Sequence, residues 1–157
     1  MKQLSILFII TLILMALSLA VLSLQDRQLP ASIIGGQEQH SPGDWIKEGQ
    51  ISVYNDRVIL ELQNPLWASF TDTNSMDPYL DETSNAIEIQ PNHPDDIVVG
   101  DIIAYKTGYG VLVHRVIEKG SDEHGVYYIV KGDNNQVRDP FKVRFQDIEG
   151  VVVAIIY

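Results

Sequence analysis

The amino-acid sequence predicts a mainly β protein, an antiparallel barrel or coiled sheet that follows one N-terminal membrane-spanning helix. Two observations carry this fold class. The first 24 residues are almost wholly apolar, whereas the later chain consists of short β-type runs separated by turn residues. No long amphipathic helical pattern interrupts those runs, and such closely spaced turns are typical of antiparallel sheets.

The N-terminal apolar run extends from Leu4 to Leu24, 21 residues without a charge. As a helix it is about 31 Å long at ~1.5 Å per residue, which matches a hydrocarbon core of ~30 Å. A cleaved signal peptide is the alternative, because Ser18-Leu19-Ala20 offers small residues at a cleavage spacing. The run is longer than a secretory apolar region, so we expect residues 1–24 to be an uncut anchor.

Charges at the two ends of this run predict its orientation. Lys2 precedes it and Asp26 and Arg27 follow it, so the positive-inside rule favours a cytoplasmic N-terminus. Residues 25–44 are rich in Gln, Gly, Pro and Ser without periodicity, which predicts a linker. Residues 45–157 are then expected to form one β domain on the outer face of the cell membrane.

Within that domain, alternating apolar and polar residues predict seven strands. The predicted strands are Gln50 to Tyr54, Val58 to Leu62, Ala86 to Gln90, Ile102 to Lys106, Val111 to Glu118, Val126 to Lys131 and Val151 to Tyr157.

Composition excludes some functions. The chain of 157 residues has 11 Lys and Arg against 21 Asp and Glu, a formal charge of −10, which argues against nucleic acid as a partner. It has no cysteine, so the fold uses neither a disulfide nor a thiolate metal site. The four histidines show no metal-ligand spacing, and no glycine-rich loop opens a helix, so we expect no metal and no cofactor.

His114 is the histidine that best fits a catalytic base. It shares a strand face with Leu112 and Val116, so its ordinary interpretation is a half-buried, hydrogen-bonded strand residue. His40, His93 and His124 fall in linker, loop and turn sequences, where solvated side chains are expected.

The other candidates also have ordinary interpretations when taken singly. Ser75 precedes a turn that contains Pro78, and such serines most often satisfy backbone amides. Asp133 and Asp139 bracket a polar loop, where carboxylates commonly cap backbone N–H groups. Together, however, Ser75, His114 and an aspartate supply the nucleophile, base and orienting carboxylate of a serine hydrolase.

The order of the motifs along the chain is more informative than any of them alone. The motifs are Ser75-Met76-Asp77-Pro78, Gly100-Asp101-Ile102-Ile103-Ala104-Tyr105, His114-Arg115-Val116-Ile117, Lys131-Gly132-Asp133-Asn134-Asn135 and Asp139. Over residues 66–157 and the anchor, this arrangement resembles type I signal peptidase in its archaeal and endoplasmic-reticulum form. The chain departs from that family by Tyr79-Leu80 after the proline and by a longer turn over Asp81 to Ile89.

The resemblance implies a function. Ser75 would be the nucleophile and His114 the general base, where bacterial members use lysine, and Asp133 or Asp139 would orient the histidine. The substrates would be secretory preproteins, cleaved after small residues of the signal peptide. The anchor would provide contact with membrane lipid, and the protein translocation channel would be a further partner.

Two other functions fit the same sequence. One is a non-catalytic, membrane-anchored β domain that binds peptides, with Ser75 and His114 serving only the turn and the core. The other is a protease of the same fold dedicated to a pilin-like precursor.

Overall fold

The computed structural model describes Ile13, Met15 and residues 40–157. The predicted anchor, apart from Ile13 and Met15, and linker residues 25–39 lie outside the described residues. No helix within the part that is described has the length and apolar character needed to cross a bilayer. Residues 40–157 belong to one compact unit, Gln39–Tyr157.

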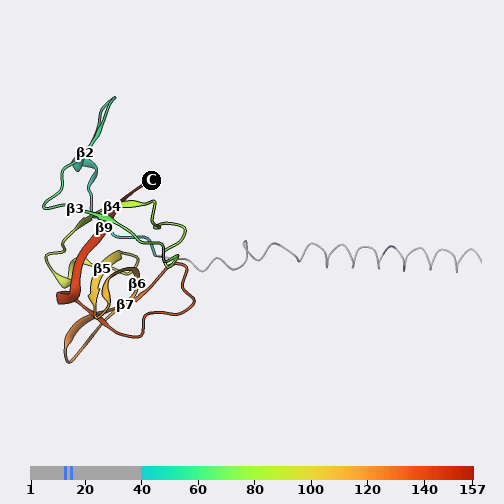
Figure 1. Cartoon of the computed structure of the whole chain (residues 1–157). Helices are drawn as coiled ribbons and strands as arrows, with labels where there is room; N and C mark the ends of the chain where they lie inside the picture. Colours follow the sequence, from blue (N-terminus) through green and yellow to red (C-terminus); the bar gives the residue numbers. More distant parts are fainter. Residues whose placement is uncertain (1–12, 14, 16–39) are drawn as a thin grey trace, which may run out of the picture. The chain divides into compact units, whose positions relative to one another are not determined.

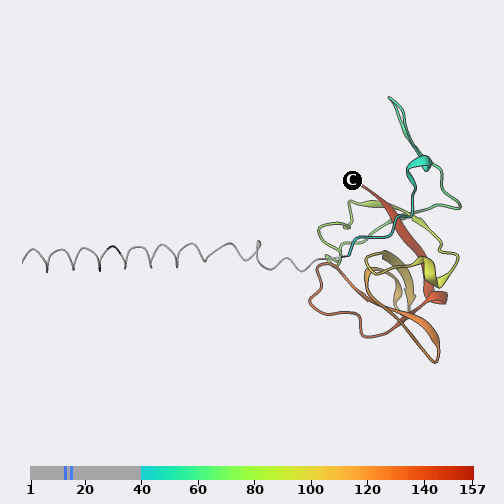
Figure 2. The ribbon, with the colours of Figure 1, turned by 180° about the vertical axis from the view of Figure 1, so that it is seen from behind.

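This unit is mainly β, as predicted, and its short helices are of the 3-10 type (Figures 1 and 2). The strands are β1 (Ile51–Val53), β2 (Val58–Leu60), β3 (Leu66–Ser69), β4 (Asn85–Ile89), β5 (Ile102–Thr107), β6 (Gly110–Asp122), β7 (Gly125–Lys131), β8 (Val143–Arg144) and β9 (Ile148–Ile156). The 3-10 helices are η1 (Glu48–Gln50), η2 (Pro94–Asp96) and η3 (Phe145–Asp147).

Seven of the strands form one sheet in the order β3-β4-β9-β5-β6-β7-β8, and every neighbouring pair is antiparallel. The C-terminal strand β9 lies between β4 and β5, which joins the two halves of the domain. Strand β3 forms one edge of the sheet. Strands β1 and β2 form a separate hairpin that extends away from this sheet (Figure 1).

Two clusters of buried side chains form the core. The larger cluster consists mainly of side chains from β5, β6, β7 and β9 and includes Tyr105, Val116 and Tyr128. The smaller one includes Met76 and Leu80 from the loop that carries Ser75. That loop is therefore held by apolar packing as well as by its backbone hydrogen bonds.

The buried carboxylate of Asp101 holds the end of the predicted linker against the sheet. Its Oδ1 accepts hydrogen bonds from Gly43 N at 2.7 Å and from the Trp45 indole at 3.0 Å, and its Oδ2 accepts one from Val98 N at 2.8 Å. The backbone of Ser41 also passes close to Gly100, and only glycine fits there, because a Cβ at this position would lie 2.2 Å from the carbonyl oxygen of Ser41. Residues 40–44 thus pack against the domain that was predicted to begin at residue 45.

The seven predicted strands are all present, with ends displaced by up to four residues. The long β6 continues to Asp122 because a bulge between Val116 and Glu118 lets its pairing with β7 resume. Strands β3 and β8 were not predicted. With four and two residues, they are too short to show an alternating pattern.

Candidate catalytic site

Ser75 lies at the start of a turn that runs from residue 75 to residue 79. The preceding Asn74 has φ of 54°, a left-handed conformation that asparagine tolerates better than most residues. The Ser75 carbonyl accepts a hydrogen bond from Asn134 N at 3.0 Å, and Asn134 Nδ2 donates to the Asn74 carbonyl at 2.9 Å. The turn with Ser75 is thereby tied to the loop that contains Asp133 and Asn134.

His114 lies on β6 opposite Ile103 of β5, and it is 6% exposed. Its strand face is shared with buried Val116, as predicted, whereas Leu112 is exposed. The hydrogen bonds that the imidazole forms with described residues all involve Nδ1. The other ring nitrogen, Nε2, is therefore the one left to exchange a proton.

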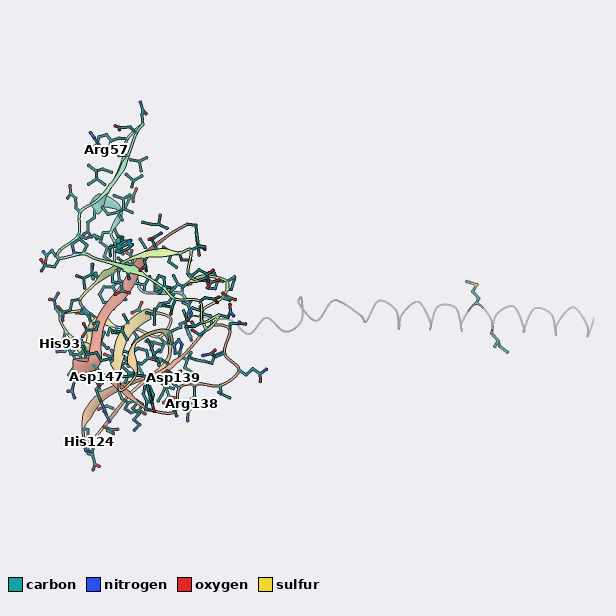
Figure 3. The ribbon with its side chains drawn as sticks, viewed as in Figure 1. Arg57, His93, His124, Arg138, Asp139 and Asp147 are labelled. Atoms are coloured by element: carbon teal, nitrogen blue, oxygen red, sulfur yellow. The ribbon has the colours of Figure 1, made fainter. Side chains whose placement is uncertain are left out.

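Asp139 is the carboxylate that contacts His114. Its Oδ1 and Oδ2 lie 3.0 Å and 3.1 Å from His114 Nδ1, and the Asp139 side chain is 9% exposed. The Asp139 backbone N–H donates to the carbonyl of Val130 at 2.9 Å, which fixes the loop to the end of β7. In Figure 3, Asp139 lies near the sheet, whereas Arg57 and His124 stand at the outer ends of two hairpins.

Tyr105 completes this buried group. Its hydroxyl donates to Asp139 Oδ2 and lies 3.2 Å from His114 Nδ1. Burial, followed by the hydrogen bond to Asp139 and the charge of that residue, raises the pKa of Tyr105 well above its usual range. The phenol therefore stays protonated and acts as a hydrogen-bond donor to the carboxylate.

Asp133, the other candidate carboxylate, pairs with Arg115 instead. Arg115 Nε and Nη2 donate to its two oxygens at 2.8 Å and 2.7 Å, and Arg115 Nη1 donates to the Gly100 carbonyl at 2.7 Å. The two side chains are only 12% and 8% exposed. The Asp133 N–H also lies 3.4 Å from the sulfur of Met76, so Asp133 supports the Ser75 turn and leaves His114 to Asp139.

Ser75 and His114 both line a cavity of about 240 Å³. Much of its wall is apolar, and the residues that supply these apolar side chains are Ala68, Phe70, Met76, Leu80, Ala104, Val111, Leu112 and Val113. Its remaining lining residues are Ser69, Thr71, Thr73 and Glu88. Ser75 and His114 thus line one cavity whose walls suit apolar side chains.

The hydroxyl of Ser75 forms its side-chain hydrogen bond with Thr73 Oγ1, at 3.2 Å. No hydrogen bond joins Ser75 to His114 within residues 40–157. Catalytic hydrogen bonds are often long without substrate, so the shared cavity is the relevant relationship between the two side chains.

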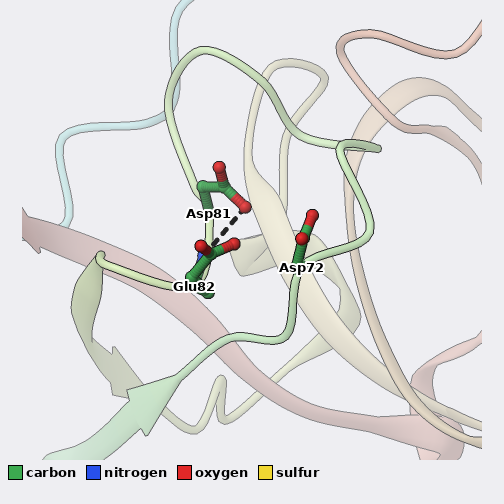
Figure 4. Close-up of side chains that lie close together, drawn as sticks. All are labelled: Asp72, Asp81 and Glu82. Atoms are coloured by element: carbon green, nitrogen blue, oxygen red, sulfur yellow. Dashed lines mark hydrogen bonds between the residues drawn. The ribbon is translucent and has the colours of Figure 1, made fainter.

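Three acidic side chains, Asp72, Asp81 and Glu82, gather on the loop around Ser75 (Figure 4). The charge of Asp72, and then that of Asp81, raises the pKa of Glu82. Glu82 and Asp72 are exposed, and the three side chains have the ordinary character of a solvated acidic surface.

Three residues of this site were not singled out by sequence reasoning: Tyr105, Thr73 and Glu88. Alternation in the predicted strand Ala86 to Gln90 puts Ile87 and Ile89 on its apolar face, so the pattern gives no sign that Glu88 is buried. Tyr105 ends an apolar run, and the pattern carries no signal for which side chains it meets across the sheet. Thr73 lies in the loop two residues before Ser75. Threonine is common in loops of every kind, so its presence there does not indicate a functional role.

No family model and no solved structure match this chain. Over 70 residues it is 33% identical to the uncharacterized protein MJ0260 of Methanocaldococcus jannaschii, an alignment that covers 37% of this chain and 34% of that protein. The chain thus spans about a third of the length of the curated relative that it matches. The resemblance to signal peptidases therefore stays a prediction from the motifs.

Proposed function

We propose that this chain is a membrane-bound serine endopeptidase of the type I signal peptidase kind, which removes signal peptides from secreted preproteins after small residues. One observation supports it most: His114 is held through Nδ1 by Asp139 and lines the same cavity as Ser75. A buried histidine that served only the core would not need a cavity shared with a hydroxyl.

The chemistry follows from the two ring nitrogens. With Nδ1 bound to Asp139, Nε2 takes the proton of Ser75 as Oγ attacks the scissile carbonyl carbon. The carbon–nitrogen bond then breaks, and His114 gives this proton to the leaving amine. Water, deprotonated by the same nitrogen, hydrolyses the ester and returns Ser75 to its hydroxyl form. Asp139 keeps the ring in the required tautomer and stabilises its cation.

The cavity suits the proposed substrate class. The cavity has a volume of about 240 Å³ and mostly apolar walls, so it can receive the small apolar side chains of a signal peptide. Two of the lining residues, Ala68 and Ser69, belong to the edge strand β3. An extended peptide beside this edge would form main-chain hydrogen bonds and place alternate side chains toward the cavity.

The proposed setting is the outer face of the cell membrane. Residues 4–24 have the length and apolarity of a single anchor, and a short tether would raise the effective concentration of enzyme and substrate. The proposed fold of this domain is a signal-peptidase-like coiled sheet, and the continuous antiparallel sheet of seven strands supports it.

The test uses the full chain in detergent with a preprotein that carries an Ala-Gln-Ala cleavage site. We expect Ser75→Ala and His114→Ala to abolish processing while the circular-dichroism spectrum is retained. Ser121→Ala and His124→Ala, at exposed positions outside the cavity, are the matched controls. Full activity in a folded Ser75→Ala protein would exclude the serine mechanism, and peptide binding without cleavage by the unmodified chain would favour the non-catalytic β domain.

A further inference from the structure

Glu88 is a buried acidic residue that lines the cavity of the candidate site. The residue is 5% exposed and lies on β4, between Leu66 of the edge strand β3 and Val152 of β9. It lines the same cavity as Ser75 and His114. Its Oε1 is shielded from solvent and has no hydrogen-bond partner among the described side chains and backbone groups.

Such a group is costly in a folded protein, because burial removes the water that would otherwise bind it. Burial, and then the charge of Glu149, raises the pKa of Glu88 above its ordinary value of 4.5. The carboxyl group nevertheless fits beside β9 because residue 150 is a glycine. A Cβ at Gly150 would lie 2.9 Å from Glu88 Oε2. The fold thus leaves room for a polar group whose partner it does not supply.

The rest of the cavity sets the size and polarity of that partner. Phe70, Met76, Leu80 and Val113 present apolar side chains, so a ligand group that reaches Glu88 must pass between apolar walls. The cavity of about 240 Å³ has room for a peptide side chain, and Glu88 is the acidic residue among those that line it.

We propose that Glu88 makes this cavity selective for substrate peptides that place a serine or threonine side chain in it, whose hydroxyl hydrogen-bonds to the Glu88 carboxyl. This inference rests on the proposed peptidase function and names the substrate class of the same site. A hydroxyl is both donor and acceptor, so it pairs with the carboxylate as well as with the carboxylic acid. A lysine ammonium would require the carboxylate, which burial disfavours.

The experiment compares cleavage rates of synthetic peptides by the full chain in detergent. Each peptide has an apolar run followed by Ala-Gln-Ala, and the first or the third of these residues is replaced in turn by Ser, Thr, Val or Lys. We expect Ser at one of the two positions to raise kcat/KM at least about tenfold over Ala, and Thr to exceed Val there by a similar factor.

Variants at position 88 separate selectivity from basal activity. The Ser-to-Ala ratio is kcat/KM for the Ser peptide divided by kcat/KM for the Ala peptide. Glu88→Leu should reduce it to about one, because an apolar wall discriminates poorly between side chains that differ by a hydroxyl. Glu88→Gln, whose amide can also hydrogen-bond to a hydroxyl, should keep most of the ratio and serves as the test if the leucine variant does not fold. Glu61→Leu and Glu61→Gln, at an exposed position outside the cavity, should leave the ratio unchanged.

The outcomes are distinct. Efficient cleavage of the Ala peptide with no gain from Ser or Thr at either position would overturn the inference while the peptidase proposal stands. Preference for Lys, or a Ser-to-Ala ratio that survives Glu88→Leu, would also overturn it. Failure to cleave any peptide or preprotein would refute the peptidase function and this inference together.

Discussion

Asp139 Oδ1 lies 3.0 Å from His114 Nδ1, although 25 residues separate them in the chain. Two antiparallel strands and a loop create this contact. His114 lies within β6, and β7 runs antiparallel beside β6. The Asp139 N–H donates a hydrogen bond to the carbonyl of Val130 near the end of β7. The two aspartates of the loop therefore have different partners: Asp139 contacts His114, and Asp133 pairs with Arg115.

Asp139→Asn is expected to lower kcat by about 10³ to 10⁴ with little change in melting temperature. The amide would present a donor to Nδ1 and favour the tautomer in which Nε2 already carries a proton. Steady-state cleavage of the Ala-Gln-Ala preprotein and a thermal melt measure the two effects. Unchanged kcat would mean that Asp139 does not orient the base.

Asp133→Asn is expected to act through stability. It leaves the Arg115 guanidinium buried without its carboxylate, and breaking a buried pair of this kind costs about 3 to 5 kcal/mol. Denaturant titration should show this loss, and the double variant Arg115→Met, Asp133→Leu should recover part of it. A stable but inactive Asp133→Asn protein would instead place Asp133 in the chemistry.

Tyr105→Phe removes the hydroxyl that donates to Asp139 and lies beside His114 Nδ1. We expect kcat to fall about tenfold and KM to stay unchanged, because one charge-assisted hydrogen bond that fixes the carboxylate is lost. Tyr109→Phe, at a fully exposed turn position, is the control. A rise in KM alone would indicate that Tyr105 acts on substrate binding.

Gly132→Ala tests how the Ser75 turn is held. An added Cβ would lie 2.5 Å from the Ser75 carbonyl oxygen and 2.6 Å from Asn135 Nδ2, so the turn or the loop must move. A displacement of about 1 Å can cost about 100-fold in rate, and we expect a loss of that order. Gly108→Ala, which meets no atom within 4 Å, should retain activity. Equal rates for the two variants would show that the turn adapts freely.

Glu88→Gln is expected to change how stability depends on pH. Because the folded-state pKa of Glu88 is raised, its favourable contribution is complete below its ordinary value of 4.5 and is lost as pH rises through the folded-state pKa. The variant should lack that decline and be more stable than the unmodified chain at neutral pH. Denaturant titrations between pH 4 and 8 measure the difference; parallel curves would contradict it.

The sequence by itself determined the mainly β class and the positions of seven strands, because period-two alternation and turn residues are local properties of the chain. It also singled out Ser75 and His114 through residue type and motif order. The membrane anchor and the peptidase activity are predictions from the sequence.

Only the tertiary structure decided which side chains meet. Asp133 and Asp139 are equivalent in sequence terms, but Arg115 binds the first carboxylate and leaves His114 to the second. Tyr105 meets His114 across the β5–β6 hairpin and Asp139 through a loop 34 residues further along the chain, and Glu88 is buried by the pairing of β4 with the C-terminal strand β9. Local pattern predicts that a strand is present, but the buried face of β4 carries Glu88, whereas Ile87 and Ile89 are only partly buried. Sheet order and loop path determine burial and neighbours here, since they depend on the packing of the whole domain.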